Sequence, residues 1–223
     1  MINYKILIKF PTRGRPERFK STLETYINLL SNKHEVKFVF TFDEDDSKMN
    51  NDEIKNYLSN LSVKNEFYYG HSKNKIQAIN ANMENQDFDI LILAADDMIP
   101  VYEEYDDFIV SEFEKSIYKL DSVLFFHSTR WANLLDIGCI MGKQYYDRFG
   151  YIYHPSYKSI FCDNEYTEVA QILGRSNFIE NKEPFKHNFI TGDETEVRNW
   201  QFNNEDTQNY NERKSKNFYL EKK

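Results

Sequence analysis

The chain has 223 residues, with 40% hydrophobic and 16% aromatic side chains, which is enough apolar surface for one core and excludes a disordered chain. Lys and Arg total 28 against 36 Asp and Glu, a net charge of −8 that repels a phosphate backbone and makes duplex nucleic acid a poor partner. The two cysteines are too few for a disulfide framework, and no apolar run approaches the roughly 20 residues that span a bilayer, so we expect a cytoplasmic globular protein without an integral membrane segment.

Short β-rich runs alternate with segments of helical periodicity in the first half of the chain. This alternation is typical of βαβ units, so it predicts an α/β fold with a mostly parallel sheet. Strands are expected over residues 4–10, 36–42, 66–69 and 90–94, and helices from Glu17 to about residue 30, over 52–61 and over 74–83. The strand over 90–94 is apolar throughout, which places it at the centre of the sheet.

The second half is less regular. A helix is expected over 105–120, strands over 122–127 and 137–141, a short helix over 143–148, an aromatic loop over 151–160 and a helix over 164–173. Pro100 is expected to stop regular strand pairing after Met98. Beyond Asp193 the chain is polar and charged, which predicts a surface helix or a tail.

Three charged loops follow predicted strands, and in open α/β sheets ligands bind at the carboxyl ends of the strands. The loops hold Thr12, Arg13 and Arg15, then the acidic run 43–46, then Asp96 and Asp97. Each loop alone could be an ordinary solvated loop, but their convergence on one sheet edge indicates a binding site.

Several familiar sites are excluded. The loop that starts at Asp43 is no EF-hand, because Lys48 and Ile54 stand where glycine and glutamate are needed. The turn around Gly14 matches neither a dinucleotide fingerprint nor a Walker A loop. Asp96 and Asp97 offer hard oxygen ligands, which suit Mg²⁺ or Mn²⁺ carrying a diphosphate.

The order of these motifs resembles the GT-A fold of nucleotide-sugar glycosyltransferases, especially those like family 2, over residues 6–187. The supporting motifs are Pro11-Thr12-Arg13-Gly14-Arg15 after the first strand, Asp43 after the second, and the segment 70–82. The resemblance implies a Rossmann-like, mostly parallel sheet with a small antiparallel extension. It also implies a donor site made of Pro11, Thr12, Arg13, Arg15, Asp43, Asp45, Lys73, Asn74, Lys75 and Asp96.

The same resemblance suggests metal ligands and a base. The Asp-x-Asp metal motif of the family falls on Ala94-Ala95-Asp96, so its first aspartate is missing. The implied Mn²⁺ or Mg²⁺ ligands are Asp96, Asp97 and His187. The implied general base is Asp163, with Glu165 as the alternative; Asp163 could instead cap the helix after it, and His187 could be an ordinary loop residue. The acceptor side would lie within residues 131–157, with Trp131 and His154 as candidates.

The expected function is inverting transfer of a hexose from a nucleotide-diphosphate donor, a UDP-sugar, to the hydroxyl of an unknown glycan or other acceptor. The expected domain covers residues 1–192, with a donor half over 1–100, an acceptor half over 101–192 and a polar helix or tail over 193–223. Two alternatives remain open. A nucleotidyltransferase of similar fold would release pyrophosphate, and a non-catalytic nucleotide- or sugar-binding module would be consistent with Ala94 in the metal motif.

Overall fold

The computed structural model describes residues 3–126, 138–188 and 192–220. Its strands are β1 (Lys5–Pro11), β2 (Glu35–Asp43), β3 (Lys64–Gly70), β4 (Ile90–Leu93), β5 (Met98–Pro100), β6 (Val123–Phe126), β7 (Ile140–Gly142), β8 (Ser176–Ile179) and β9 (Phe185–His187). Its helices are α1 (Pro16–Asn28), α2 (Asp52–Ser59), α3 (Lys75–Asn80), α4 (Tyr105–Lys115), α5 (Lys143–Tyr146), α6 (Cys162–Ile172), α7 (Glu194–Trp200) and α8 (Asn203–Ser215), followed by the short 3₁₀ turn η1 (Asn217–Tyr219). None of the helices in these ranges is long and apolar enough to cross a membrane.

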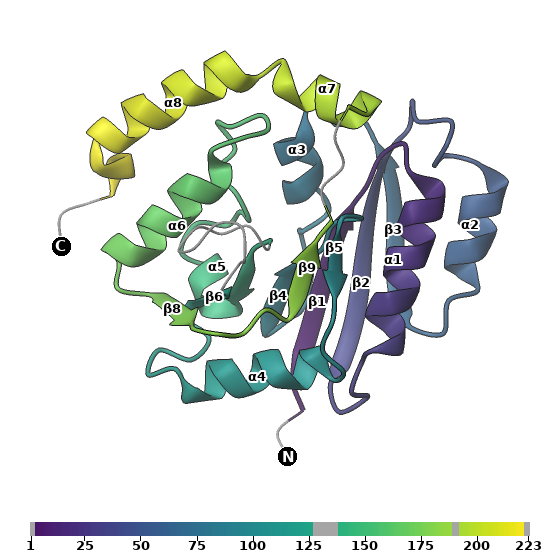
Figure 1. Cartoon of the computed structure of the whole chain (residues 1–223), viewed down its shortest axis with the longest axis horizontal. Coiled ribbons are helices and arrows are strands. Elements are labelled where there is room, and N and C mark those ends of the chain that lie inside the picture. Colours follow the sequence, from purple (N-terminus) through teal and green to yellow (C-terminus); the bar gives the residue numbers. More distant parts are fainter. Residues whose placement is uncertain (1–2, 127–137, 189–191, 221–223) are drawn as a thin grey trace.

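A seven-stranded sheet runs through the molecule in the order β3-β2-β1-β4-β7-β6-β8 (Figure 1). Strands β1 to β4 are parallel to one another, β7 is antiparallel to β4 and β6, and β8 is parallel to β6. Strands β5 and β9 form a separate antiparallel pair. The expected α/β class, with a mostly parallel sheet and a small antiparallel extension, is confirmed.

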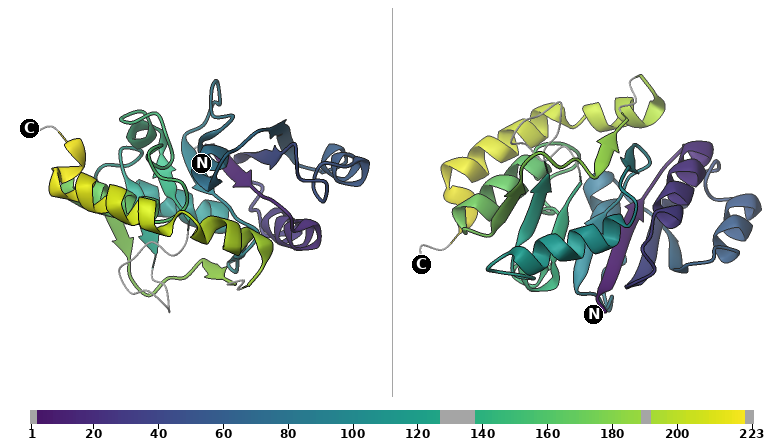
Figure 2. Two further views of the ribbon diagram at one scale, coloured as in Figure 1. Left: turned by 90° about the horizontal axis from the view of Figure 1, so that it is seen from above. Right: turned by 60° about the horizontal axis from the view of Figure 1, so that its bottom comes forward.

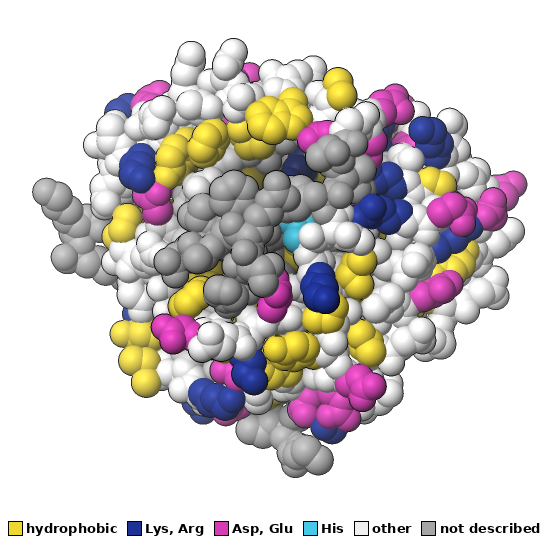
Figure 3. All heavy atoms as spheres, in the orientation of Figure 1, with side chains coloured by type: hydrophobic (Ala, Val, Ile, Leu, Met, Phe, Trp, Pro, Cys, Tyr) yellow, Lys and Arg dark blue, Asp and Glu magenta, His cyan; other side chains and the backbone are white. Residues whose placement is uncertain are grey.

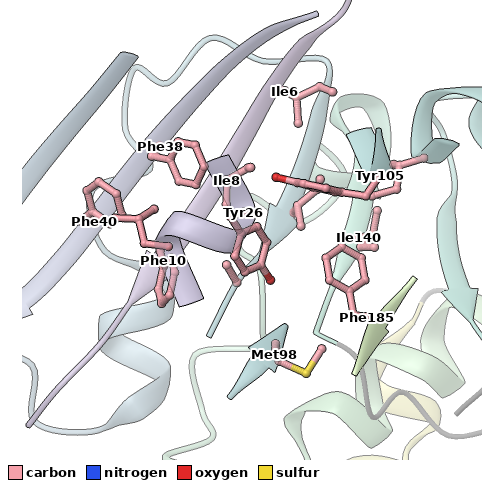
Figure 4. Close-up of a cluster of buried hydrophobic side chains, with 14 of the residues drawn as sticks. Ile6, Ile8, Phe10, Tyr26, Phe38, Phe40, Met98, Tyr105, Ile140 and Phe185 are labelled. Atoms are coloured by element: carbon pink, nitrogen blue, oxygen red, sulfur yellow. The ribbon is translucent and has the colours of Figure 1, made fainter. Parts of the chain in front are cut away.

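Both faces of the sheet are covered, because successive side chains of each strand point to opposite faces. Ile6, Ile8 and Phe10 of β1 pack with α1, α2 and α4, whereas Leu7 packs on the other face with α3, α5 and α6. Figure 4 shows part of the first cluster, in which Tyr26 of α1 lies among side chains from β1, β5 and β9. This double cover accounts for the continuous apolar runs in the central strands.

The structure corrects the expectation for Pro100. Met98–Pro100 forms β5 and pairs with Phe185–His187. Pro100 is tolerated because it is the last residue of a two-stranded pair, where a missing N–H group interrupts little of the ladder. The helix expected to reach residue 120 ends at Lys115, where the Ser116 hydroxyl accepts a hydrogen bond from the Tyr118 amide (3.2 Å) and so competes with helix continuation.

The polar segment after Asp193 forms α7, which lies near the sheet edge where β1, β2 and β3 end, and α8, which runs on over α6 (Figure 1). Figure 2 shows the same helices from above, lying across the body of the molecule. Although α8 is highly polar, its Asp206 is fully buried, and Phe218 of η1 is also buried. The C-terminal segment is therefore packed against the body of the fold through α8 and η1.

Candidate donor site at the carboxyl edge of the sheet

The loops after β1 and β2 are joined by an arginine. Arg13 donates hydrogen bonds to Asp43 (2.7 Å) and to both carboxylate oxygens of Asp45 (2.6 and 3.1 Å). The other oxygen of Asp43 accepts the amide of Ser72 after β3 (3.2 Å). The hydrogen bond from Arg13 lowers the pKa of Asp45 below its ordinary value. The ends of β1, β2 and β3 therefore meet at Arg13 and Asp43.

Glycine is needed at one position of the first loop. Gly14 has φ +74°, a left-handed conformation that side chains with a Cβ avoid. Its amide donates to the Asp46 carboxylate (2.6 Å), and Asp46 also accepts the amide of Lys48 (3.1 Å). These contacts hold the backbone between Arg13 and Arg15 in one conformation. The turn therefore positions the guanidinium groups of both arginines.

Asp96, after β4, is clamped from several sides. Its carboxylate accepts hydrogen bonds from Arg15 (2.9 Å) and Thr12 (3.1 Å). Its backbone carbonyl accepts from Arg18 (3.0 Å) and Thr22 (2.9 Å) of α1. Burial raises the pKa of Asp96 above its ordinary value and outweighs the opposing charge of Arg15. Asp96 thus connects the first loop to the end of β4, and its role as a metal ligand stays a prediction.

Asp97 and His187 face each other across the β5–β9 pair. The His187 Nε2 lies 3.4 Å from the Asp97 Oδ2, and the Asn188 amide donates to the Asp97 carbonyl (2.7 Å). Neighbouring Met98 and Phe185 are buried in the core, which anchors both ends of the pair. Burial alone would raise the pKa of Asp97, but the hydrogen bond and charge of His187, helped by Lys75 and Arg15, hold it below its ordinary value. A carboxylate and an imidazole are thus held together at the site.

Within the described ranges, no cluster of three or more His, Cys, Asp or Glu side chains could hold a metal ion. Mg²⁺ commonly takes only one or two carboxylates from the protein and completes its shell with substrate phosphates and water. The assignment of Asp97 and His187 as metal ligands stays a prediction.

The segment after β3 places two lysines at the start of α3. Lys73 and Lys75 are exposed, and Lys75 is close enough to Asp97 to influence that carboxyl. Asn74, also predicted to bind the donor, is the N-cap of α3 and accepts the Gln77 amide (2.9 Å). Its side-chain oxygen is therefore used locally, whereas both ammonium groups face solvent.

The two candidate bases on α6 have different surroundings. Asp163 lies in the first turn, not at the N-cap, which is Phe161, so the side-chain capping interpretation of Asp163 is not observed. Its Oδ1 accepts the Asn164 amide (3.0 Å). Glu165 is buried, takes two hydrogen bonds from Arg213 (2.7 and 2.8 Å) and accepts one from Tyr157 (2.8 Å). The ion pair with Arg213 ties Glu165 to α8.

Of the two acceptor candidates, only His154 lies among the described residues. Trp131 lies outside the described residues. His154 hydrogen-bonds with Ser156 (2.8 Å) and lines a cavity of about 20 Å³ beside Tyr151 and Glu165. His154 is thus grouped with α6 and the aromatic loop, and its contact with an acceptor stays a prediction.

Three residues at the site were missed from the sequence: Arg18, Asp193 and Arg198. Asp193 pairs with Arg15 (2.6 Å) from 178 positions away, and Arg198 donates to the Ser72 carbonyl (3.4 Å). The spacing of Asp193 and Glu196 is a helix-start signal, and Asp193 does cap α7. No sequence signal indicates that this helix crosses to the loops of β1 and β3.

No protein-family model and no curated protein sequence matches this chain. Solved structures do match in shape. Residues 1–349 of Staphylococcus aureus TarS in complex with UDP-GlcNAc superpose with a TM-score of 0.62 at 13% identity, over 86% of this chain and 60% of that one. The mannosyltransferase PcManGT from Pyrobaculum calidifontis, in complex with GDP-Man and Mn²⁺, superposes with a TM-score of 0.63 at 11% identity, over 81% of this chain and 56% of that one.

The chain has the GT-A fold of nucleotide-sugar glycosyltransferases. The resemblance found in the sequence is thereby confirmed at the level of fold. This GT-A chain spans less than two thirds of the length of the structures it matches.

Proposed function

We propose that this chain is a glycosyltransferase that moves a sugar from a nucleotide-diphosphate donor to an acceptor hydroxyl. The observation that carries the proposal is the convergence of Arg13–Asp43, Arg15–Asp96 and Asp97–His187 on one sheet edge of a GT-A fold. Cations for a diphosphate and carboxylates for a nucleoside or a metal are thus combined where α/β sheets bind ligands.

The donor is proposed to be a UDP-sugar lying across the loops of β1, β2 and β3. Asp43 and Arg13 would contact the nucleoside, supported by Pro11, Thr12 and Asp45, while Lys73 and Lys75 would meet the phosphates. TarS and PcManGT were solved with UDP-GlcNAc and GDP-Man, which supports a nucleotide sugar as the ligand class. Arg15 would orient Asp96 and complete the positive side of the site.

Asp97 and His187 would hold Mn²⁺ or Mg²⁺ together with the donor diphosphate. PcManGT was solved with Mn²⁺. When bound, the metal neutralises negative charge on the leaving diphosphate. Asp96, the residue that matches the family motif, is proposed as a third ligand, and Arg15 and Thr12 hold its carboxylate in place.

The proposed reaction inverts the anomeric carbon. Asp163 takes the proton of the acceptor hydroxyl while that oxygen forms a bond to the anomeric carbon, and the bond from that carbon to the diphosphate oxygen breaks. The ionised carboxylate is the state that a general base requires. Lys73 and Lys75 stabilise the departing diphosphate, and positioning accounts for much of the remaining rate enhancement.

The test is thermal unfolding with UDP, GDP, UDP-GlcNAc and GDP-Man, each with and without Mn²⁺, alongside nucleoside diphosphate release in the presence of candidate acceptors. A ligand at a hundred times its Kd adds about 2.7 kcal/mol to stability, which raises the Tm of a chain this size by roughly 5 to 11 °C. We expect one nucleotide sugar to give a shift of this size and to be turned over. The Asp97→Asn variant is expected to lose the Mn²⁺-dependent part of the shift.

Arg13→Gln and Arg148→Gln make a matched pair, because both arginines lie in carboxylate ion pairs but Arg148 pairs with Asp121, away from the donor loops. Only Arg13→Gln is expected to lose the nucleotide shift. Pyrophosphate release from a nucleoside triphosphate would instead identify a nucleotidyltransferase. Binding without turnover, unchanged in Asp163→Asn, would identify a binding module.

A further inference from the structure

One face of α8 touches the segment that leads into the proposed base. Asp206, Tyr210 and Arg213 are spaced i, i+4 and i+7, so they lie on the same side of the helix. All three contact residues between positions 158 and 165, and Asp163 lies inside this stretch. We call Asp206, Tyr210 and Arg213 the α8 contact face.

Asp206 is the first of these contacts and is fully buried. Its carboxylate accepts backbone N–H groups from Lys158 (2.9 Å), Ser159 (2.7 Å) and Ile160 (2.9 Å). A buried charge is tolerated where hydrogen bonds satisfy it, and such bonds are stronger than neutral ones. One side chain of α8 therefore fixes the backbone of three consecutive residues just before α6.

The next residue, Phe161, adopts a strained conformation. Its φ of 61° lies in the left-handed region, which is costly for a bulky side chain and persists only where neighbouring contacts enforce it. The Phe161 ring stacks on Tyr210 with centroids 5.1 Å apart and an angle of 18° between planes. Asp206 on one side and Tyr210 on the other hold this turn, which sets the direction in which α6 begins.

Arg213 makes the third contact, with Glu165, which lies two residues beyond Asp163 in the sequence. Its guanidinium donates two hydrogen bonds to Glu165 (2.7 and 2.8 Å), a bidentate geometry that restricts rotation as well as distance. Glu165 also accepts from the Tyr157 hydroxyl (2.8 Å). Residues on both sides of Asp163 in the sequence, Phe161 and Glu165, are therefore held by contacts with α8.

We propose that the α8 contact face positions the catalytic base, with Asp206, Tyr210 and Arg213 acting through the 158–165 segment on Asp163. This inference rests on the proposed function. The segment after Asp193 would then be part of the catalytic apparatus, although none of these three residues touches the reacting atoms. Their role is to hold Asp163 at the orientation in which it can reach the acceptor hydroxyl.

The chain carries its own reporter for this role. Cys162 is buried next to Asp163, and its thiol lies 3.7 Å from the Ser159 carbonyl, in the backbone stretch that Asp206 holds. Cys139 is equally buried but precedes β7. Cys139 contacts Tyr166, one turn further along α6. Labelling with iodoacetamide, quantified for each cysteine by peptide mass spectrometry, therefore separates loosening at the first turn of α6 from loosening of the rest of that helix and from general unfolding.

The test compares Asp206→Asn with the matched control Asp106→Asn in the full-length chain. Asp106 is also fully buried and holds a loop, but it accepts the amide and hydroxyl of Ser31 (2.8 and 2.6 Å), in the connection between α1 and β2. For Asp206→Asn we expect kcat to fall at least tenfold while the donor KM stays within twofold of wild type. We also expect the labelling rate of Cys162 to rise at least tenfold while the labelling rate of Cys139 stays unchanged. For Asp106→Asn we expect a comparable loss of stability with kcat and Cys162 labelling unchanged.

The inference is overturned if both variants lose kcat in proportion to stability, or if Asp206→Asn changes the donor KM instead of kcat. Should Asp206→Asn not fold, Arg213→Lys and Arg213→Met replace it. Lysine keeps a cation for Glu165 but not the bidentate geometry, so kcat is expected to fall in both variants and to fall further in Arg213→Met. Equal kcat in these two variants overturns the inference. A wild-type chain that binds no nucleotide sugar and turns none over overturns the proposed function itself, and that result is read before any variant is compared.

Discussion

Asp163 and Glu165 share one helical turn of α6, yet they are held differently. Glu165 is buried in an ion pair with Arg213, whereas Asp163 is half-buried in the first turn. Removing one partner of a buried ion pair leaves the other charge uncompensated. The chemistry of a base needs a carboxylate that can leave its present contacts, and Glu165 is the poorer of the two for this purpose.

We therefore expect Asp163→Asn to lower kcat by about 10³-fold, in the range found for general bases, and to change the free energy of unfolding by less than about 1 kcal/mol. Glu165→Gln should instead cost about 3 kcal/mol of stability and lower kcat far less. Urea unfolding and steady-state kinetics on both variants check this. The assignment of the base is wrong if Glu165→Gln is the variant that loses kcat while keeping its stability.

Lys9 is a fully buried lysine on β1. Its ammonium donates to the Ala81 carbonyl (2.7 Å) and to the Thr41 hydroxyl. Burial lowers the pKa of Lys9 to about 7, with only Glu84 opposing the shift. An unfolded lysine titrates near 10.4, so between pH 7 and pH 10 the unfolded chain binds a proton that the folded chain lacks.

Because the unfolded state binds more protons in this window, the contribution of Lys9 to stability should rise with pH, by at most about 1.4 kcal/mol per unit. Below pH 7 both states are protonated and the contribution should be flat. The measurement is the free energy of unfolding of wild type minus that of Lys9→Met, from pH 6 to pH 9. A difference that does not change over this range would show that Lys9 stays charged in the folded chain.

At the scale of elements, α7 is the least buried of the longer helices that bear on the donor loops. None of its residues is buried, and Val197 and Trp200 are 66% and 57% exposed. Its attachments include the Asp193–Arg15 and Glu194–Lys48 ion pairs, the Arg198 contact to the Ser72 carbonyl and a 3.5 Å contact from Thr195 to the Arg13 carbonyl. An element with few apolar contacts opens locally at low free-energy cost.

Asp193→Ala removes the N-cap of α7 together with its ion pair to Arg15. Because the loss of a cap costs about 1 kcal/mol, we expect trypsin to cleave after Arg198 roughly fivefold faster. Asn51→Ala is the matched control, because Asn51 caps α2 by accepting the Ile54 amide (3.0 Å). That variant should speed cleavage after Lys55 and leave Arg198 unaffected. Equal acceleration at both sites in both variants would mean that cleavage reports global unfolding.

At the scale of the whole molecule, the net charge of −8 coexists with a local group of arginines at the carboxyl edge. Arg13, Arg15 and Arg18 come from one turn and the helix after it. On the face seen in Figure 3, basic and acidic side chains are interspersed and form no continuous basic surface. Such a surface suits a small phosphorylated ligand and opposes a long polyanion.

We expect that a 20-base-pair DNA duplex at micromolar concentration does not bind at 0.15 M salt and does not displace a bound nucleotide sugar, because duplex binding requires many phosphate contacts. Fluorescence anisotropy of labelled duplex, with unlabelled nucleotide as competitor, measures both. Salt-dependent duplex binding that competes with the nucleotide would contradict this account of the site.

The periodicity of the first hundred residues was enough to predict the parallel half of the sheet, since strands buried on both faces are continuous apolar runs. The loop residues Arg13, Asp43 and Asp96 could be found because they directly follow such strands. Strands β5, β8 and β9 were missed. They are as short as β4, β6 and β7, which were predicted, but those three are fully buried, whereas each of the missed strands includes residues that are at least partly exposed. In addition, β5 and β9 lie far apart in the sequence.

By itself the sequence determined the α/β class, the GT-A resemblance and the strand-end loops, because these follow from local periodicity and from residues next to each other in the chain. Only the tertiary structure decided which charges meet. The Asp97–His187 pair, the crossing of Asp193 to Arg15 and the contacts of α8 with the 158–165 segment join residues that are remote in sequence. Such pairings depend on how whole elements pack, and a single sequence carries no local signal for them.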